Sequence, residues 1–308
     1  MAKKDLLSFR DLSREEIEAV FEMARDLKNK QKRGIPHPFL AHKCLAMIFE
    51  KPSLRTRVTF ETGMVQLGGQ AVFLGPNEVQ LGVRETPADC ARSLSRWVDL
   101  ITVRTFSQER VEEIARYASV PVINALTDLS HPCQVLADCF TLLEHKGGLA
   151  GLKISFVGDG NNMVHSWMEA AEQFPISFAL ACPQGYGPNQ EIEQRARRNG
   201  AQITVTHSVE EAVHEADVVY TDVWASMGRE DESGARARAF RPYQVNEDVV
   251  AVAKKDAVVM HCLPAHRGEE ITHEVLEGPQ SIAFDQAENR LHVQKAIMVW
   301  LLNESRVS

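Results

Sequence analysis

Residues 51–61 read Lys-Pro-Ser-Leu-Arg-Thr-Arg-Val-Thr-Phe-Glu and directly follow a strand-like apolar run at residues 43–49. Pro52 ends that run. The helical pattern after it places two hydroxyl side chains and two arginines, Arg55 and Arg57, in its first turn. A helix N-terminus carries unpaired N–H groups and partial positive charge, so basic residues there are unfavourable unless an anion binds. The stretch therefore predicts a strand-to-helix unit that holds a doubly charged phosphate group, with a solvated basic turn as the alternative.

Short apolar runs alternate with helical patterns on both sides of this stretch. We expect strands at residues 43–49, 70–74, 99–105, 120–124, 152–157, 176–182, 201–206, 217–222, 256–261 and 281–285. We expect helices at residues 13–34, 55–67, 87–97, 108–118, 132–144, 163–173, 188–199, 208–215, 242–253 and 291–303. This alternation predicts an α/β fold of two doubly wound parallel-sheet domains, with the active site in the cleft between them.

A glycine-rich segment at residues 146–151, Lys-Gly-Gly-Leu-Ala-Gly, separates a predicted helix from a predicted strand. Glycines in such a position are typical of a linker or hinge. We therefore expect a first domain at residues 1–147 and a second at residues 148–287. The apolar C-terminal helix, at about residues 288–308, is expected to pack back on the first domain.

The composition is that of a water-soluble globular protein, with 308 residues, 44% apolar residues and a net charge of −8. That charge gives no electrostatic reason to bind nucleic acid or an anionic membrane. The six cysteines form no CxxC pair, which favours reduced thiols and a cytoplasmic location. The sequence has neither a secretory signal pattern at its start nor a run of 18 apolar residues.

Unusual polar residues follow several of the predicted strands, where ligands of parallel α/β domains bind. They are Arg104, His131 with Gln134, Asp159-Gly160-Asn161-Asn162, Asp222, and His261-Cys262-Leu263-Pro264. His131 can polarise a carbonyl or accept a proton, although a histidine that only caps the next helix would look the same. Arg104 has few structural uses at a strand end unless it pairs with a carboxylate such as Asp99 or Glu109.

Two of these segments leave alternatives open. The turn at residues 158–163 resembles a dinucleotide fingerprint, but Met163 occupies the position of the third glycine and Asp159 would face the pyrophosphate. Asp222 precedes a loop at residues 224–234, which reads either as a lid over a cationic substrate or as a solvated surface loop. Cys262 is either a nucleophilic thiol or part of a bend in which backbone carbonyls face the site, with a cis Leu263–Pro264 bond a further possibility.

Together these motifs resemble the aspartate/ornithine carbamoyltransferase family, and its ornithine branch in particular, nearly from end to end. The motifs are Ser53-Leu54-Arg55-Thr56-Arg57, Gln80-Leu81-Gly82, His131-Pro132-Cys133-Gln134, Gly158-Asp159-Gly160-Asn161-Asn162, Asp222 with Ser226-Met227-Gly228, His261-Cys262-Leu263-Pro264 and Glu288-Asn289-Arg290. Leu54, Pro87 and Cys133 depart from the residues that are common in the family, but none of them removes a charge that the chemistry requires.

The resemblance implies transfer of the carbamoyl group of carbamoyl phosphate to the δ-amine of L-ornithine, giving L-citrulline and phosphate without a cofactor or metal. It implies a carbamoyl phosphate site made of Ser53, Leu54, Arg55, Thr56, Gln80, Arg104, His131, Pro132, Cys133, Gln134, Cys262, Leu263 and Arg290. Of these, Arg104, His131 and Cys262 would be catalytic, and Gln80 would reach the phosphate of a neighbouring subunit. Ornithine would be bound by Asn162, Asp222, Ser226 and Met227.

The resemblance further implies a homotrimer or an assembly of trimers that acts in arginine biosynthesis. Three alternatives remain at this stage. The first is a carbamoyltransferase for another acceptor, such as putrescine, an N-acylated ornithine or aspartate. The second is an NAD-dependent dehydrogenase that uses the turn at residues 158–163, and the third is a non-catalytic relative kept for binding or assembly.

Overall fold

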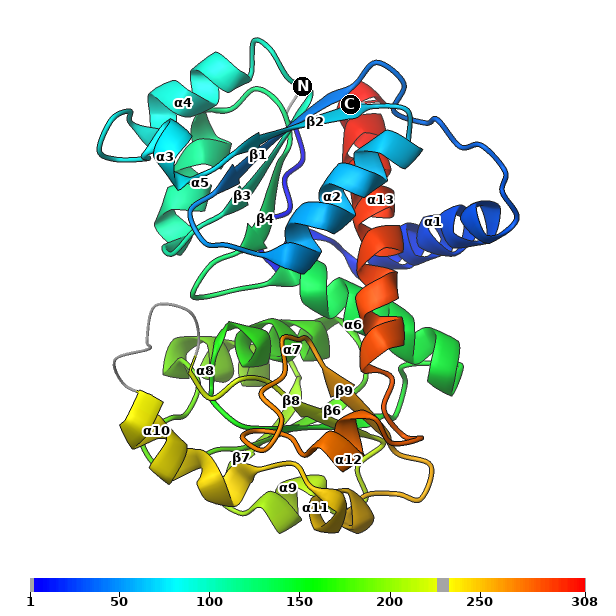
Figure 1. Cartoon of the computed structure of the whole chain (residues 1–308), viewed down its shortest axis with the longest axis vertical. Coiled ribbons are helices and arrows are strands. Elements are labelled where there is room, and N and C mark those ends of the chain that lie inside the picture. Colours follow the sequence, from blue (N-terminus) through cyan, green and yellow to red (C-terminus); the bar gives the residue numbers. More distant parts are fainter. Residues whose placement is uncertain (1–2, 226–232, 308) are drawn as a thin grey trace. The chain divides into compact units, whose positions relative to one another are not determined.

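The structure is a computed structural model that describes residues 3–225 and 233–307. It divides into two compact units. Unit 1 comprises Met1–Phe140 with Glu288–Ser308, and unit 2 comprises Thr141–Ala287. Each unit is built around a parallel sheet with helices on both faces (Figure 1), which confirms the predicted fold class. The division falls ahead of the glycine-rich segment 146–151, and the domain boundary at residues 147 and 148 stays a prediction.

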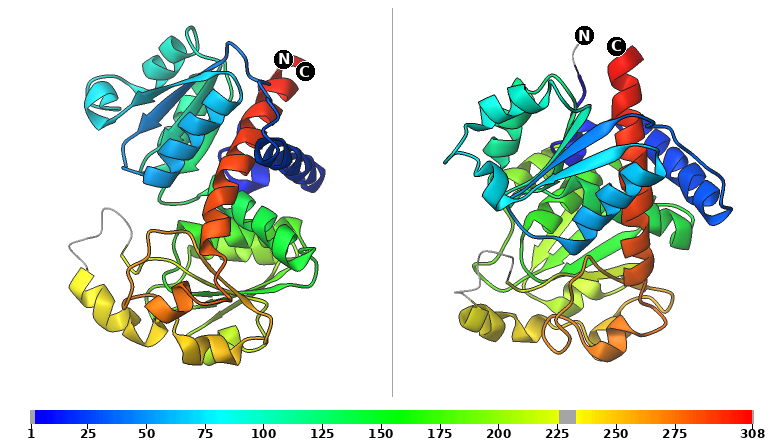
Figure 2. Two further views of the ribbon diagram at one scale, coloured as in Figure 1. Left: turned by 45° about the vertical axis from the view of Figure 1, so that its right-hand side comes forward. Right: turned by 45° about the horizontal axis from the view of Figure 1, so that its top comes forward.

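Unit 1 has a four-stranded parallel sheet in the order β2-β1-β3-β4. Its strands are β1 (Cys44–Phe49), β2 (Gln70–Leu74), β3 (Leu100–Arg104) and β4 (Val122–Leu126). Its helices are η1 (Phe9–Asp11), α1 (Arg14–Lys32), α2 (Leu54–Gln66), α3 (Pro76–Val79), α4 (Pro87–Leu94), α5 (Gln108–Tyr117), the first part of α6 (Pro132–Lys146) and most of α13 (Ala283–Val307). Helices α2 and α13 lie on one side of this sheet, and α4 and α5 lie on the other (Figures 1 and 2).

The burial of the strands explains why unit 1 could be predicted from apolar runs. Every residue of β3 is buried, and so is all of β1 except Cys44, because helices cover both faces of the sheet. Strand β2 is the edge strand and is partly exposed. Helix α1 begins at a capping box in which the Ser13 backbone N–H donates to the Glu16 carboxylate at 2.7 Å.

Unit 2 has a five-stranded parallel sheet in the order β7-β6-β5-β8-β9. Its strands are β5 (Lys153–Val157), β6 (Ser177–Ala181), β7 (Gln202–Thr206), β8 (Val218–Thr221) and β9 (Val258–His261). Its helices are α7 (Asn162–Gln173), α8 (Gln190–Arg198), α9 (Val209–Val213), α10 (Ser233–Phe240), η3 (Arg241–Tyr243), α11 (Glu247–Val252) and α12 (His273–Leu276). Helices α7 and α8 cover one face and α9 and α11 the other (Figure 1).

Near the end of unit 2, one predicted strand is wrong and one predicted helix is shorter than expected. Residues 281–285 form no strand; Ser281 makes a single bridge to Val259, and α13 starts at Ala283. An apolar run this short does not distinguish a strand from the start of a helix. The helix predicted at 242–253 is shorter, because Pro242 lies in η3 and Asn246 caps the start of α11. None of the helices in residues 3–225 and 233–307 is both long and apolar enough to cross a membrane.

Lys295 of α13 is fully buried inside unit 1, where three neutral groups accept its hydrogen bonds. Its Nζ donates to Gln31 Oε1 at 2.7 Å and to Gln66 Oε1 at 2.8 Å, and it lies 3.2 Å from His37 Nε2. These groups come from α1, from α2 and from the loop between α1 and β1, so one ammonium ties three segments to α13. Burial lowers the pKa of Lys295 to about 8.

The lowered pKa makes stability depend on pH in a defined direction. In the unfolded chain a lysine keeps its proton up to about pH 10.4, so between about pH 8 and pH 10 the unfolded state binds more protons and the free energy of unfolding rises with pH. We expect the wild-type protein to gain about 2 kcal/mol relative to Lys295→Met between about pH 7.5 and 9.5, measured by urea unfolding. Substitution of the exposed Lys32 by Met is the matched control. Equal pH profiles for wild type and Lys295→Met would contradict the lowered pKa of Lys295.

Candidate active site

In unit 1, four residues separate the end of β1 at Phe49 from the start of helix α2 at Leu54. Ser53 is its N-cap, and its Oγ accepts a hydrogen bond from the Thr56 backbone N–H at 3.2 Å. The two arginines of this helix start differ in their surroundings. The guanidinium of Arg57 lies 3.7 Å from the centroid of the Phe73 ring and pairs with Glu61, so it helps to hold α2 on β2. Arg55 is half-buried two residues nearer the helix start.

Arg290 connects three helices of unit 1 through one buried guanidinium. Its Nη2 donates to Thr56 Oγ1 of α2 at 3.0 Å, and its Nη1 donates to Gln134 Oε1 of α6. The amide nitrogen of Gln134 in turn donates to Asp138 at 2.8 Å. Three predicted site residues that are far apart in the sequence therefore lie together. Asp138 was missed, although its position four residues after Gln134 on the same helix is a readable signal.

His131 lies near the guanidiniums of both Arg290 and Arg104. Arg104 is the last residue of β3, and His131 directly precedes α6; both are nearly fully buried. Burial holds the pKa of His131 well below its usual range, and the positive charges of Arg290 and Arg104 lower it further. His131 is therefore a neutral imidazole between two guanidiniums, able to donate one hydrogen bond to an oxygen without carrying charge itself.

The remaining unit 1 residues of the predicted site have different environments. The Cys133 side chain is fully buried, donates to the Asn124 carbonyl at 3.4 Å, and has a pKa raised to about 12 by burial. It is a neutral thiol directed into the core, so a ligand would meet the backbone of this residue. Pro132 is the first residue of α6. Gln80 ends α3 in a left-handed conformation, with φ of 49°, and is exposed.

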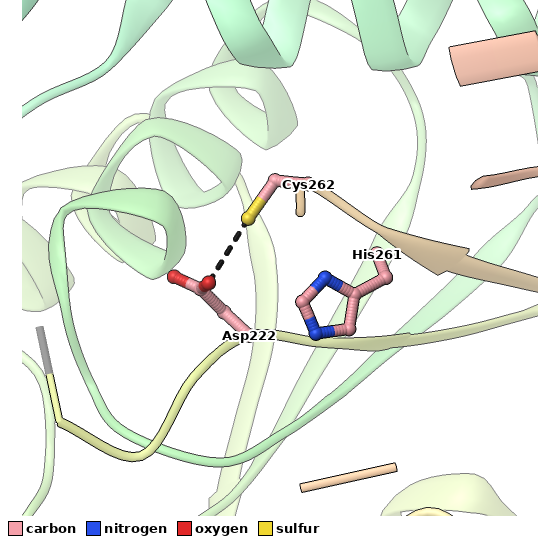
Figure 3. Close-up of side chains that lie close together, drawn as sticks. All are labelled: Asp222, His261 and Cys262. Atoms are coloured by element: carbon pink, nitrogen blue, oxygen red, sulfur yellow. Dashed lines mark hydrogen bonds between the residues drawn. The ribbon is translucent and has the colours of Figure 1, made fainter. Parts of the chain in front are cut away.

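In unit 2, Asp222 is surrounded by hydrogen-bond donors at the end of β8. Its Oδ1 accepts from the Cys262 thiol at 3.0 Å and from the Val223 backbone N–H at 2.8 Å, and its Oδ2 accepts from Asn161 Nδ2 at 2.9 Å. Figure 3 shows the Asp222 carboxylate and the Cys262 thiol facing each other across the ends of two strands. The structure thus brings together residues that follow β5, β8 and β9, as expected for parallel strands.

Asn161 belongs to a motif that the sequence singles out, but no site role was assigned to it. Its Oδ1 caps α7 by accepting from Met163 N and Val164 N, which leaves its Nδ2 to donate to Asp222. The predicted ligand Asn162 is the neighbouring residue, half-buried at the first position of α7. The other two predicted ornithine ligands, Ser226 and Met227, lie outside the residues that the structure describes.

A buried histidine–glutamate pair shapes the segment that carries Cys262. His261 Nδ1 accepts from the Leu263 backbone N–H at 2.8 Å, so the ring proton lies on Nε2 and is donated to Glu270 Oε1 at 3.0 Å. His261 and Glu270 are both fully buried. Leu263 has a positive φ of 56° and is followed by a cis bond to Pro264. Glu270, also missed from the sequence, therefore holds His261, which fixes the backbone after Cys262.

Asp222, His261 and Cys262 also have the chemistry of a zinc ligand set, since one ligand atom from each lies within 4.8 Å of the others. Both ring nitrogens of His261 are already engaged, one by Leu263 and one by Glu270. A metal bound by all three side chains would have to break one of these bonds. The arrangement therefore suits a thiol–carboxylate pair better than a resident metal ion.

Comparison with known protein families gives two matches that together cover the described units. Residues 4–144 match the carbamoyl-P binding domain of aspartate/ornithine carbamoyltransferase. Residues 150–301 match the Asp/Orn binding domain of the same family.

Curated relatives and solved structures agree with these matches. The ornithine carbamoyltransferase of Syntrophus aciditrophicus is 56% identical over 301 residues, covering 97% of this chain and 100% of the relative. That of Geobacter sulfurreducens is 52% identical over 97% of this chain and 99% of its own. The structure of the Pyrococcus furiosus ornithine carbamoyltransferase superposes with a TM-score of 0.93 at 50% identity, covering 98% of each chain. An anabolic ornithine carbamoyltransferase from Campylobacter jejuni gives 0.92 at 40% identity, covering 98% and 99%.

The electrostatics around His131 lead to a direct spectroscopic expectation. Because burial and two neighbouring guanidiniums disfavour the imidazolium, His131 should stay neutral at pH 6, where an ordinary histidine is mostly protonated. Nitrogen-15 NMR of histidine-labelled protein would give the protonation state, and His131→Gln would assign the signal by removing it. A titration midpoint near 6.5 for that signal would show that the arginines do not lie beside the ring.

Proposed function

The chain belongs to the aspartate/ornithine carbamoyltransferase family, and we propose that it transfers the carbamoyl group of carbamoyl phosphate to the δ-amine of L-ornithine, giving L-citrulline and phosphate. The observation that carries this proposal is the identity of 50% or more to ornithine carbamoyltransferases over nearly the whole chain. The local geometry supports it in both units. Unit 1 collects buried positive charge around Arg290, and unit 2 collects donors around the Asp222 carboxylate.

Carbamoyl phosphate binds to the residues of unit 1. Ser53, Leu54, Arg55 and Thr56 hold the phosphate with the backbone N–H groups and side chains of the α2 N-terminus. Arg104, His131 and Thr56 donate to the carbamoyl oxygen, where negative charge develops when the carbonyl carbon is attacked. Gln134 orients the carbamoyl amide. Arg290, which donates to Gln134, adds a further positive charge to the anion site. Pro132 and Cys133 contribute backbone contacts, consistent with the inward direction of the Cys133 thiol.

Ornithine binds to the residues of unit 2. Asp222 and Asn162, together with Ser226 and Met227, hold its α-amino-acid end. Attack on the carbamoyl carbon requires a neutral δ-amine, whereas an amine of this kind is mostly protonated at pH 7. The Cys262 thiol, held by Asp222, positions this neutral amine, and the backbone carbonyls of Cys262 and Leu263 accept from the carbamoyl NH₂. The leaving phosphate takes up the proton that the amine loses, and the guanidiniums of unit 1 stabilise its charge.

Three further features are part of the proposal. The protein forms a homotrimer or an assembly of trimers, in which Gln80 reaches the phosphate site of a neighbouring subunit. It works in the cytoplasm, which is supported by its free cysteines and by the absence of a disulfide among the described residues. It acts in arginine biosynthesis, in line with the anabolic relative from Campylobacter jejuni.

The activity is tested by a colorimetric citrulline assay with purified protein, carbamoyl phosphate and L-ornithine. We expect citrulline to form when ornithine is the acceptor. Putrescine, N-acetylornithine and aspartate should each react far more slowly. Arg55→Ala should lower turnover by about 10²- to 10³-fold, the usual cost of removing one donor to developing or departing charge. Arg57→Ala, which loses a contact to Phe73, is the matched control and should lose much less. Equal rates with putrescine and ornithine would refute the assigned acceptor.

Exposed apolar residues on unit 1 support the proposed trimer. Leu54 and Val65 of α2 are 72% and 70% exposed, and Val58 lies on the same helix face. Val72 of the neighbouring edge strand β2 is also exposed. A row of large apolar side chains along a helix and an adjoining sheet edge is typical of a surface that another subunit covers.

The trimer can be tested by mass and by mixing. Light scattering should give a mass of three chains, or of a multiple of three, for the wild type, and Val65→Glu should shift it toward monomers. Separately inactive Arg55→Ala and Gln80→Ala proteins should regain activity when their subunits are mixed, because some mixed trimers would contain one site without either substitution. A monomeric wild-type protein, or mixtures that stay inactive, would contradict the shared site.

A further inference from the structure

Arg236 of α10 is a buried guanidinium for which the mechanism above has no use. Its side chain is 3% exposed, and it lies over the Tyr186 ring at 5.0 Å and the Phe240 ring at 5.9 Å. A charge that far inside a protein is costly unless it is paired and fully hydrogen-bonded. Arg236 is paired with Asp159, since Nη1 donates to Asp159 Oδ2 at 2.9 Å, and the same atom donates to the Trp224 carbonyl at 2.9 Å.

These two partners lie at matching positions on the two arms of the ornithine half-site. Asp159 is two residues before Asn161 on the turn that follows β5. Trp224 is two residues after Asp222 on the segment that follows β8. Asn161 Nδ2 donates to Asp222 Oδ2, so the two arms are joined at one end by this bond and at the other by Arg236.

The result is a closed ring of covalent and hydrogen bonds within unit 2. It runs from Arg236 to Asp159, along the chain to Asn161, across to Asp222, along the chain to Trp224 and back to Arg236. The Asp159 arm is also packed tightly from behind. The Gly160 N–H donates to the Tyr186 carbonyl at 2.9 Å, and a Cβ on Gly160 would lie 2.3 Å from the backbone carbon of Gly187.

We propose that Arg236 is a positioning residue for ornithine, which fixes Asp222 and the Asn161–Asn162 pair in register by closing this ring. The inference rests on the proposed function, because it assigns ornithine to the residues that the ring holds. Arg236 is joined to Asp222 through Trp224 on one side and through Asp159 and Asn161 on the other, and it acts on the substrate only through this ring. One guanidinium nitrogen donates to both arms, so loss of the Arg236 side chain removes both bonds at once.

Steady-state kinetics of four variants tests the proposal: Arg236→Met, Arg236→Lys, Asp159→Asn and the double variant Arg236→Met/Asp159→Asn. L-Norvaline, which has the ornithine backbone and aliphatic chain without the δ-amine, serves as an inhibitor that reports on the α-amino-acid end alone. Arg236→Met should raise the KM for ornithine and the inhibition constant of norvaline together, by about tenfold or more, and change the KM for carbamoyl phosphate by less than about twofold.

The other variants separate positioning from general stability. Arg236→Lys should fall between wild type and Arg236→Met, and if Arg236→Met does not fold, Arg236→Lys is judged by the same criteria. The double variant should have the same KM for ornithine as Arg236→Met, because the single substitution already opens the ring. Arg195→Met is the matched control: Arg195 pairs with Glu169 at 2.7 Å and joins α7 to α8 in the same unit without contacting the ring. It should lower the melting temperature and leave the ornithine KM unchanged.

Each outcome discriminates between the proposals. Folded Arg236 variants with an unchanged ornithine KM, or with both substrates affected equally and in proportion to lost stability, would overturn the positioning role. Additive effects in the double variant would show that Arg236 and Asp159 act independently and would also overturn it. A wild-type protein that forms no citrulline would instead refute the proposed function, so the two failures are distinguishable.

Discussion

Concentrated positive charge in a dry environment is the constraint on which unit 1 depends. Arg104, His131 and Arg290 lie close together and are nearly fully buried, where like charges repel strongly and cannot be relieved by water. The protein reduces this repulsion in two ways. His131 gives up its proton, and Arg290 is hydrogen-bonded to neutral oxygens of Thr56 and Gln134. The positive charges of Arg104 and Arg290 form a fixed electrostatic field. An anionic substrate balances this field and therefore stabilises the arrangement that binds it.

Unit 2 contains a negative charge in place of positive ones, on the carboxylate of Asp222. Asp222 accepts from a thiol, an amide and a backbone N–H, which come from three different strand ends. None of these donors carries a charge, so the negative charge of Asp222 is oriented without being cancelled. A cationic or amine substrate is then the natural partner of this site. The same logic explains the buried His261–Glu270 pair, which fixes the backbone beside Cys262 and leaves the thiol to Asp222.

Most strands were predictable because helices cover both faces of each sheet, which makes strands such as β3 continuous apolar runs. That polar residues after β5, β8 and β9 would lie close together was predictable because the ends of parallel strands converge. What could not be predicted was which polar atoms would meet. Arg236 is 77 residues from Asp159, and their contact exists only because α10 returns to the β5 turn. Asn161 was overlooked in favour of Asn162, since a cap and a ligand look alike in sequence. The strand predicted at residues 281–285 is wrong because a short apolar run fits either a strand or the start of a helix.

Gly160 shows how little room the turn after β5 has. Its backbone N–H is bonded to Tyr186, and the space where a side chain would begin is filled by the main chain of Gly187 and Pro188. Main-chain atoms do not move aside as a flexible side chain would. Every missense change of a glycine codon adds at least one carbon, and here that carbon has nowhere to go. This codon is therefore one at which inherited variation should be absent, even where neighbouring surface positions drift freely.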